Sequence, residues 1–284
     1  MNHALTTEFF SGLCRLFAIC CMGLGISLGG VTVATAGPVV CGEKPIRLAY
    51  YEYGYFYFHD GGLTARGMDK DIGDELAKRS GCKFDVQVLA RARIWADLAS
   101  GDLDMSTSGI QNPDRDKFAW FAHYLSMKNY AVLQTAVAAR VSSAHAFIKN
   151  TKLQFGAVRA FKHGAEQDKW LETLRTAQRV QDSANVETLF KKLHEGRIDA
   201  LFSQPPVYGK YLHDAGLKKD VVVQDWTPGE KGIPHGLILA KSRFTEDQAK
   251  HWQALVQAMR NDGTLKRIYL QYLSPTEAAS LLDF

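Results

Sequence analysis

Apolar positions along the chain follow two periods in turn, and this pattern predicts alternating strands and helices. Residues 46–50 and the alternating apolar positions of 84–88 are typical of buried strands. Between them, Met68, Ile72 and Leu76 recur every four residues and predict a helix that stops near Gly81. Another helix ends at 101, and 103–105 opens a third strand. The alternation favours α/β construction with parallel sheets.

The same pattern starts again at about residue 131. The expected strands of this second half are 153–158, 200–202, 221–223 and 237–240. The expected helices are 165–176, one face at 186–193 that ends at 196, one that begins with a capping box at 245–248, and 265–272.

A similar eight-residue motif occurs in both halves of the chain. Residues 98–105 read LASGDLDM and residues 193–200 read LHEGRIDA. Each is typical of a helix end, a left-handed glycine, and a strand that begins with an apolar residue and Asp. This repeated motif favours two lobes of similar architecture. The alternative is coincidence, because such junctions are common in α/β proteins.

The first 36 residues predict an export signal. The apolar stretch 16–33 follows the single basic residue Arg15 and ends in Ala-Thr-Ala at 34–36. This order is typical of a secretory signal peptide cleaved after about Ala36, which predicts that the mature protein is exported. The alternative is a retained membrane anchor, because 18 residues approach the minimum for a spanning helix.

Composition narrows the classes of protein further. The chain has 284 residues, 46% hydrophobic and 23% charged, with a formal net charge of +4. These values exclude collagen, disordered and many-span membrane proteins, and the mild charge argues against a nucleic-acid partner. Removing 36 residues leaves 248, enough for two compact units. The histidines lack metal-ligand spacing, and neither a phosphate loop nor a nucleophile elbow is present, so we expect no metal and no cofactor.

Two of the five cysteines, Cys41 and Cys82, follow the predicted cleavage point. Two cysteines in an exported protein predict one disulfide. Each lies just before a predicted strand, so they can meet at one sheet edge if the two strands are parallel neighbours. The alternative is a pair of free buried thiols.

Four stretches in order carry a family resemblance. They are 68–77 (MDKDIGDELA), 101–121 with Gly-Asp-Leu-Asp and Asn-Pro-Asp-Arg, 187–200 ending in Gly-Arg-Ile-Asp-Ala, and 261–269 (NDGTLKRIY). Behind a signal peptide, they make the chain resemble the bacterial periplasmic solute-binding proteins of family 3, the polar amino-acid class.

The resemblance implies a type II periplasmic-binding fold, which is α/β with parallel-rich mixed sheets flanked by helices and a two-segment hinge. Lobe 1 is expected at 37–130 plus 236–284, and lobe 2 at 131–235. The implied protein is a monomer without enzymatic activity that closes over a small-molecule ligand and delivers it to an inner-membrane ABC permease.

The resemblance also implies ligand-binding residues in the first lobe. Arg115 stands where the family's arginine pairs with the ligand α-carboxylate, and a guanidinium fork suits that role. Ser108 and Gly109 match positions that offer a hydroxyl and backbone N–H groups. The alternative for Arg115 is a surface arginine after a turn. Ile110 and Gln111 depart from the family pattern, in which a Thr or Ser is often found.

The second lobe departs further from the family. An Asp that accepts from the ligand ammonium in many members falls here on Ser203 or Gln204, both neutral. The loss of that charge weakens the case for an ordinary α-amino acid. In the strand-to-helix turn 158–164, we expect Arg159 and Phe161 to contact the ligand and His163 to be an exposed polar residue.

The loop after the first strand adds candidates at the crevice. Tyr51, Glu52 and Tyr53 begin an aromatic run, and loops after strand ends line ligand crevices in open sheets. Arg91 and Arg93 follow the second strand and favour a carboxylate-rich solute together with the arginine of the signature. The alternatives are packing of the aromatics into the lobe and a solvated loop for the arginines.

An enzyme on the same fold is the second hypothesis. The fold also carries cyclohexadienyl dehydratases and the sensing domains of receptors. A dehydratase needs an acid placed over the bound ligand, and Glu52 is the candidate for that acid.

Overall fold

A computed structural model describes residues 38–214 and 216–284. The predicted signal peptide and its expected cleavage point after Ala36 lie outside these ranges. Within them, no helix is both long enough and apolar enough to cross a membrane.

The first sheet has five strands in the order β4-β1-β5-β12-β6. β1 pairs in parallel with β4 and β5, whereas β12 is antiparallel to β5 and β6. The parallel strands therefore end at one edge of the sheet, where their following loops gather. The bounds are β1 (Ile46–Tyr50), β4 (Phe84–Val88), β5 (Met105–Ile110), β6 (Ala119–Met127) and β12 (Ile233–Ala240).

The second sheet also has five strands, in the order β11-β7-β10-β8-β9. β8 is parallel to β9 and β10, and β7 runs antiparallel to β10 and β11. A separate two-stranded hairpin, β2 (Phe58–His59) and β3 (Ala65–Arg66), follows the aromatic loop. The bounds are β7 (Tyr130–Gln134), β8 (Phe155–Val158), β9 (Val180–Ser183), β10 (Ala200–Ser203) and β11 (Val221–Gln224).

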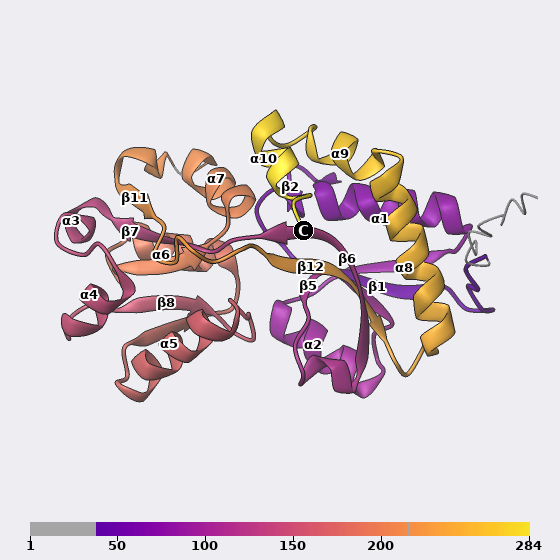
Figure 1. The fold of residues 1–284 in the computed structure, drawn as a ribbon, viewed down its shortest axis with the longest axis horizontal. Helices are drawn as coiled ribbons and strands as arrows, with labels where there is room; N and C mark the ends of the chain where they lie inside the picture. Colours follow the sequence, from indigo (N-terminus) through magenta and orange to yellow (C-terminus); the bar gives the residue numbers. More distant parts are fainter. Residues whose placement is uncertain (1–37, 215) are drawn as a thin grey trace, which may run out of the picture. The chain divides into compact units, whose positions relative to one another are not determined.

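Helices connect the strands of both sheets, and Figure 1 shows α1 and α2 on opposite sides of the first sheet. The helices of the first sheet are α1 (Met68–Ser80), α2 (Arg91–Ser100), η1 (Arg115–Lys117), α8 (Glu246–Asn261), α9 (Thr264–Tyr269) and α10 (Pro275–Ser280). Those of the second are α3 (Thr135–Ala138), α4 (Ala144–Lys149), α5 (Ala165–Thr176), α6 (Val186–His194), α7 (Pro205–Asp214) and η2 (Leu217–Lys219).

Two connections join the sheets, as Figure 1 shows. β6 runs into β7 across Lys128 and Asn129, and the chain returns from β11 to β12 through residues 225–232. Asn129 is buried at this crossing. The described residues thus have the two-segment link between sheets that the resemblance implies.

Successive side chains of the buried strands pack into hydrophobic clusters on opposite faces of a sheet. In β10, Ala200 and Phe202 pack in a cluster with Phe147 of α4 and Leu171 of α5. Leu201 between them belongs to the larger cluster that includes α6. Successive side chains of a strand point to opposite faces, so this short run of apolar residues covers both faces of the second sheet.

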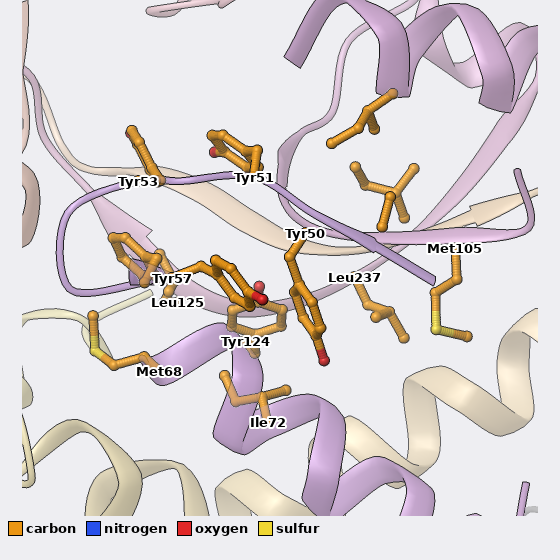
Figure 2. Close-up of a cluster of buried hydrophobic side chains, with 14 of the residues drawn as sticks. Tyr50, Tyr51, Tyr53, Tyr57, Met68, Ile72, Met105, Tyr124, Leu125 and Leu237 are labelled. Atoms are coloured by element: carbon orange, nitrogen blue, oxygen red, sulfur yellow. The ribbon is translucent and has the colours of Figure 1, made fainter. Parts of the chain in front are cut away.

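The aromatic run after β1 is divided in the same way. Figure 2 shows Tyr50 and Tyr57 on the side of α1, whereas Tyr51 and Tyr53 lie on the other side of the segment. Tyr50 stacks on Tyr57, with ring centroids 4.9 Å apart. Gly73 of α1 makes room for Tyr50, because a Cβ there would lie 1.8 Å from the Tyr50 hydroxyl. All four of these tyrosines belong to one buried core cluster, but only Tyr50 and Tyr57 lie on the side of α1.

The motif repeated at 98–105 and 193–200 has the same structural role in both halves. Gly101 ends α2 and Gly196 follows α6, each with a positive φ. The carboxylate of Asp104 then accepts from the backbone N–H of Arg47 at 2.9 Å, and that of Asp199 accepts from the N–H of Gln154 at 2.7 Å. In both lobes the Asp fixes the entry of a neighbouring parallel strand.

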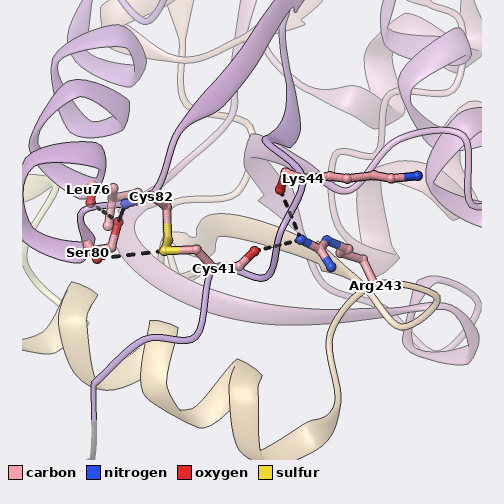
Figure 3. Close-up of a disulfide and its surroundings, with 6 residues drawn as sticks. All are labelled: Cys41, Lys44, Leu76, Ser80, Cys82 and Arg243. Carbon is pink, nitrogen blue, oxygen red and sulfur yellow. Dashed lines mark hydrogen bonds between the residues drawn. A yellow bond between two sulfur atoms is a disulfide. The ribbon is translucent and has the colours of Figure 1, made fainter.

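The predicted disulfide between Cys41 and Cys82 is present, with Cα atoms 5.2 Å apart (Figure 3). It joins the segments that precede β1 and β4, whose register pairs Ile46 with Phe84. The Arg243 guanidinium donates to the carbonyl of Cys41 at 2.6 Å. The bridge lies at the amino ends of these strands, away from the loops at their carboxyl ends.

Candidate ligand-binding site

The carboxyl ends of strands from both sheets meet at one place. Around it lie a cavity of about 190 Å³ and a smaller one of about 20 Å³ that share Val158, Phe161 and Val186. The larger is otherwise lined by Tyr51, Glu52, Val88, Leu89, Ala90, Arg91, Ala184 and Asn185. The smaller is otherwise lined by Tyr53, His163, Leu189, Phe190, Phe202, Ser203, Gln204 and Val207. Strand-end loops of this kind form ligand crevices in α/β proteins.

Arg91 is the cationic residue that lines the larger cavity. It is 3% exposed, and its guanidinium carbon lies 4.3 Å from the centre of the Tyr51 ring. Its Nη2 donates to the carbonyl of Ser108 at 3.1 Å, while its buried Nε has no hydrogen-bond partner. Stacking and the backbone carbonyls of Thr107 and Ser108 hold this cation and leave the Nε donor free for a ligand.

Arg115 joins the two sheets rather than lining a cavity. Its Nη1 donates to the carbonyl of Ile110 at 2.7 Å, and its Nη2 donates to the carbonyl of Ala160 in the second lobe at 3.1 Å. Its guanidinium carbon lies 3.6 Å from the centre of the Trp95 ring. Burial, together with the charge of Arg91, lowers the pKa of Arg115 to about 9, so it is still charged at neutral pH.

The Ser108 side chain is directed into the protein, and Gly109 is closely packed against the core. The Ser108 hydroxyl donates to the Asp69 carboxylate at 2.9 Å, and the Tyr124 hydroxyl donates to the same oxygen at 2.7 Å. Burial raises the pKa of Asp69 to about 6, although these hydrogen bonds lower it. A Cβ at Gly109 would lie 2.4 Å from Ile238 Cγ1. The structure does not bring these two groups to the cavities.

A neutral hydrogen-bond chain crosses between the lobes beside the smaller cavity. The Tyr53 hydroxyl donates to Gln204 Oε1 at 2.5 Å, and Gln204 Nε2 donates to Asn129 Oδ1 at 2.5 Å. Asn129 Nδ2 in turn donates to the carbonyl of His163 at 2.6 Å. Gln204 is 1% exposed, and its amide oxygen and nitrogen are paired with Tyr53 and Asn129. Both polar groups of this buried amide are therefore satisfied by the protein itself.

The other candidates lie at the edges of the site. Glu52 is exposed, and its carboxylate lies 3.1 Å from His59 Nδ1. Arg159 is exposed, whereas the Phe161 ring lies 5.6 Å from that of Tyr53. The expectation that His163 is exposed is wrong: it is 4% exposed, because its ring packs against Phe161 and Phe202.

Sequence reasoning missed Trp95 and Asn129. Trp95 has the apolar spacing of an ordinary core position on α2, and no pattern distinguished it as the platform for two guanidiniums. Asn129 lies in the two-residue link between β6 and β7, where neither period applies. Its position at the crossing of the two lobes becomes visible only in three dimensions.

A separate cavity of about 450 Å³ lies along α6 and α7, and Glu52, Phe58 and His59 form its other wall. It includes exposed charges of both signs and does not contain Arg91 or Arg115. Among the described residues, no group of three or more His, Cys, Asp or Glu side chains is arranged to hold a metal ion. The pair of cavities at the strand ends, the larger of which is lined by Arg91, is therefore the candidate site.

The chain is similar to known binding proteins over most of its length. A probable histidine-binding protein from Neisseria gonorrhoeae is 23% identical over 261 residues, which cover 90% of this chain and 94% of that protein. An ancestral arginine-binding protein bound to arginine has a TM-score of 0.69 at 20% identity and covers 81% of this chain and 98% of its own.

An ancestral amino-acid-binding protein described as a precursor of cyclohexadienyl dehydratase has a TM-score of 0.65 at 20% identity, covering 81% of this chain and 96% of its own. These likenesses confirm the type II periplasmic-binding fold. Residues 46–275 match the bacterial extracellular solute-binding proteins, family 3, and the chain belongs to this family.

Proposed function

We propose that this protein captures a small carboxylate-bearing solute, an amino acid or a related compound, and delivers it to an inner-membrane ABC permease. In this proposal the lobes are 37–130 plus 236–284 and 131–235, and the solute binds between them as they close. The mature protein is a periplasmic monomer, released by cleavage after about Ala36. The family match and the position of the cavities between strand ends support this function.

One observation carries the proposal. Arg91 and Arg115 are both more than nine-tenths buried at the meeting of the lobes, and within the described residues neither forms a salt bridge with a carboxylate. A buried cation without a counter-ion is costly. A ligand carboxylate would supply the missing charge, and it would favour the state in which the two lobes surround it.

A thermal-shift screen of the purified protein tests the function. We expect carboxylate-bearing solutes to raise the melting temperature, whereas polyamines and neutral sugars leave it unchanged. A ligand at 100 times its Kd stabilises the native state by about 2.7 kcal/mol, which corresponds to a shift of roughly 5–10 °C for a protein of this size. If polyamines stabilise the protein and acids do not, the proposal is wrong.

Catalysis is the weaker alternative. The acid that a dehydratase would need, Glu52, is exposed, and its carboxylate is paired with His59. We therefore expect no product when the protein is incubated with prephenate or arogenate. Formation of product above the uncatalysed rate would replace the binding function with an enzymatic one.

A further inference from the structure

We infer that the solute is a small organic acid without an ammonium group, held through its carboxylate by Arg91 and the Tyr51 hydroxyl at the start of α2. This inference rests on the proposed function and names the substrate class of the same site. Four features carry it: two unpaired donors, an uncapped helix start, a neutral opposite wall and the size of the cavity.

The first feature is a pair of buried donors without acceptors. Arg91 Nε and Tyr51 Oη have no hydrogen-bond partner, although the two residues are 3% and 5% exposed. Both residues line the larger cavity. Buried polar groups are nearly always paired in folded proteins, so two unpaired donors that belong to residues lining one cavity point to an acceptor supplied by a ligand. A carboxylate offers two such oxygens.

The second feature is the start of α2. Arg91 and Arg93 lie in its first turn, which contains no acidic residue, and Ala90 provides no side-chain cap. Cations at a helix amino end oppose the helix dipole, and the first amides of a helix have no partners within it. An anion beside Arg91 would reverse this unfavourable arrangement.

The third feature is the wall that faces these donors. It consists of Phe161, Val158 and Val186, which also line the smaller cavity together with Gln204. The amide of Gln204 is already satisfied by Tyr53 and Asn129. Among the described residues that line either cavity, the one carboxylate is Glu52, which is exposed and paired with His59. A ligand ammonium would therefore lose its water without gaining a buried charge.

The fourth feature is size. The larger cavity has about 190 Å³, roughly the volume of six water molecules. That volume fits an acid of about four or five carbons whose apolar part lies against Phe161.

Calorimetric titration with matched pairs of acids tests the inference. Succinate and aspartate differ by one ammonium group, as do glutarate and glutamate. We expect the acid without the ammonium to bind roughly tenfold or more tightly in each pair, because the missing charge-assisted contact has about that value. Equal or tighter binding of the amino acid overturns the inference but leaves the proposed function intact. Binding of no carboxylate at all overturns the proposed function as well.

Substitutions identify the groups responsible. Tyr51→Phe keeps the ring under Arg91 and removes the hydroxyl, and we expect succinate affinity to fall about tenfold. Arg91→Gln should abolish binding. The matched control is Arg66→Gln, which removes an exposed arginine outside the site that pairs with Asp60 at 2.7 Å, and it should retain affinity. Unchanged affinity in Tyr51→Phe, or equal losses in the two arginine variants, contradicts the assignment.

Two further measurements separate the alternatives. Gln204→Glu places a carboxylate in the smaller cavity, which shares Val158, Phe161 and Val186 with the larger one, and should shift preference toward aspartate by about tenfold or more. If it leaves the preference unchanged, Gln204 does not determine the ligand class and the inference fails. Inorganic sulfate and phosphate should bind much more weakly than succinate, because they offer no apolar part to the aromatic wall. Equal affinity for sulfate would mean a general anion site and would overturn the inference.

Discussion

The hydroxyl of Tyr53, in the loop after β1, donates a 2.5 Å hydrogen bond to Gln204 at the start of α7, and this bond connects the two lobes. Both residues are almost completely buried. The lobes are therefore held together by groups of the protein itself as well as by any ligand. Because the bond must break when the cleft opens, it contributes to the balance between open and closed states.

Tyr53→Phe tests this bond. The substitution keeps the stacked ring but leaves Gln204 Oε1 without its donor, which costs about 1–3 kcal/mol. We expect a lower free energy of unfolding and a larger radius of gyration without ligand, measured by urea denaturation and small-angle X-ray scattering. Tyr55→Phe is the control, because no hydrogen bond of its hydroxyl occurs within the described residues. Equal effects of the two substitutions would contradict a specific role for Tyr53.

Gly54→Ala should hinder closure. Gly54 has a φ of +54°, and a Cβ there would lie 2.5 Å from the Cα of Val207 and 2.7 Å from the carbonyl of Pro206 in α7. Because the clash is with backbone of the other lobe, we expect a more open protein with at least about tenfold weaker ligand binding.

The control for Gly54→Ala is Gly209→Ala. Gly209 lies within α7, and no heavy atom lies within 4 Å of a Cβ built there. This substitution should leave ligand affinity unchanged and raise stability by up to about 1 kcal/mol through helix propensity. Small-angle scattering measures closure of both variants, and calorimetric titration measures their ligand affinity. If Gly54→Ala closes and binds like the unchanged protein, the contact between Gly54 and α7 is not required for closure.

Removal of the disulfide should affect stability but not binding. The bridge closes a loop with a sequence separation of 41 residues, and the chain-entropy relation gives about 4 kcal/mol for such a loop. The site lies at the opposite ends of the strands that the bridge anchors. We expect the Cys41→Ser, Cys82→Ser double variant to unfold at a lower urea concentration and to bind its solute with unchanged affinity. A loss of affinity in the folded variant would link the bridge to the site.

The fold was accessible from the sequence where periodicity is strong. The helix at Met68, Ile72 and Leu76 and the strands on either side of it lie where the pattern indicates. The hydrophobic pattern did not predict the elements at 119–134 and 205–214, which form β6, β7 and α7. There, strands pass from one sheet to the other, and a helix begins with two prolines, so neighbours in space determine the structure more than local spacing does.

The sequence predicted the general position of the binding site but not which side chains line it. The family signature directed attention to Arg115, whose guanidinium donates to the carbonyl of Ala160 in the other lobe. Which arginine lines the cavity depends on the start of α2 at Arg91, a boundary that the apolar spacing from Ile94 does not fix. The inward direction of Ser108 depends on Asp69, which is 39 residues away in sequence.

Asp69 should make stability depend on pH. Burial raises its pKa to about 6 in the folded protein, above its ordinary value of 3.8. The folded state therefore binds the proton more tightly than the unfolded state, and this carboxyl favours folding below pH 4 and loses that contribution as pH rises through 6. The full difference is about 3 kcal/mol. Burial lowers the pKa of His235 to about 3, which has the opposite effect over pH 3–6.5.

The contribution of Asp69 is therefore measured as a difference between Asp69→Asn and the unchanged protein. Asn keeps an oxygen that can accept from Ser108 and Tyr124 but does not titrate. We expect the variant to gain stability relative to the unchanged protein as pH increases from 4 to 7, by urea denaturation at each pH. A constant difference across this range would show that Asp69 does not titrate there, and that the hydrogen bonds at its carboxylate outweigh its burial.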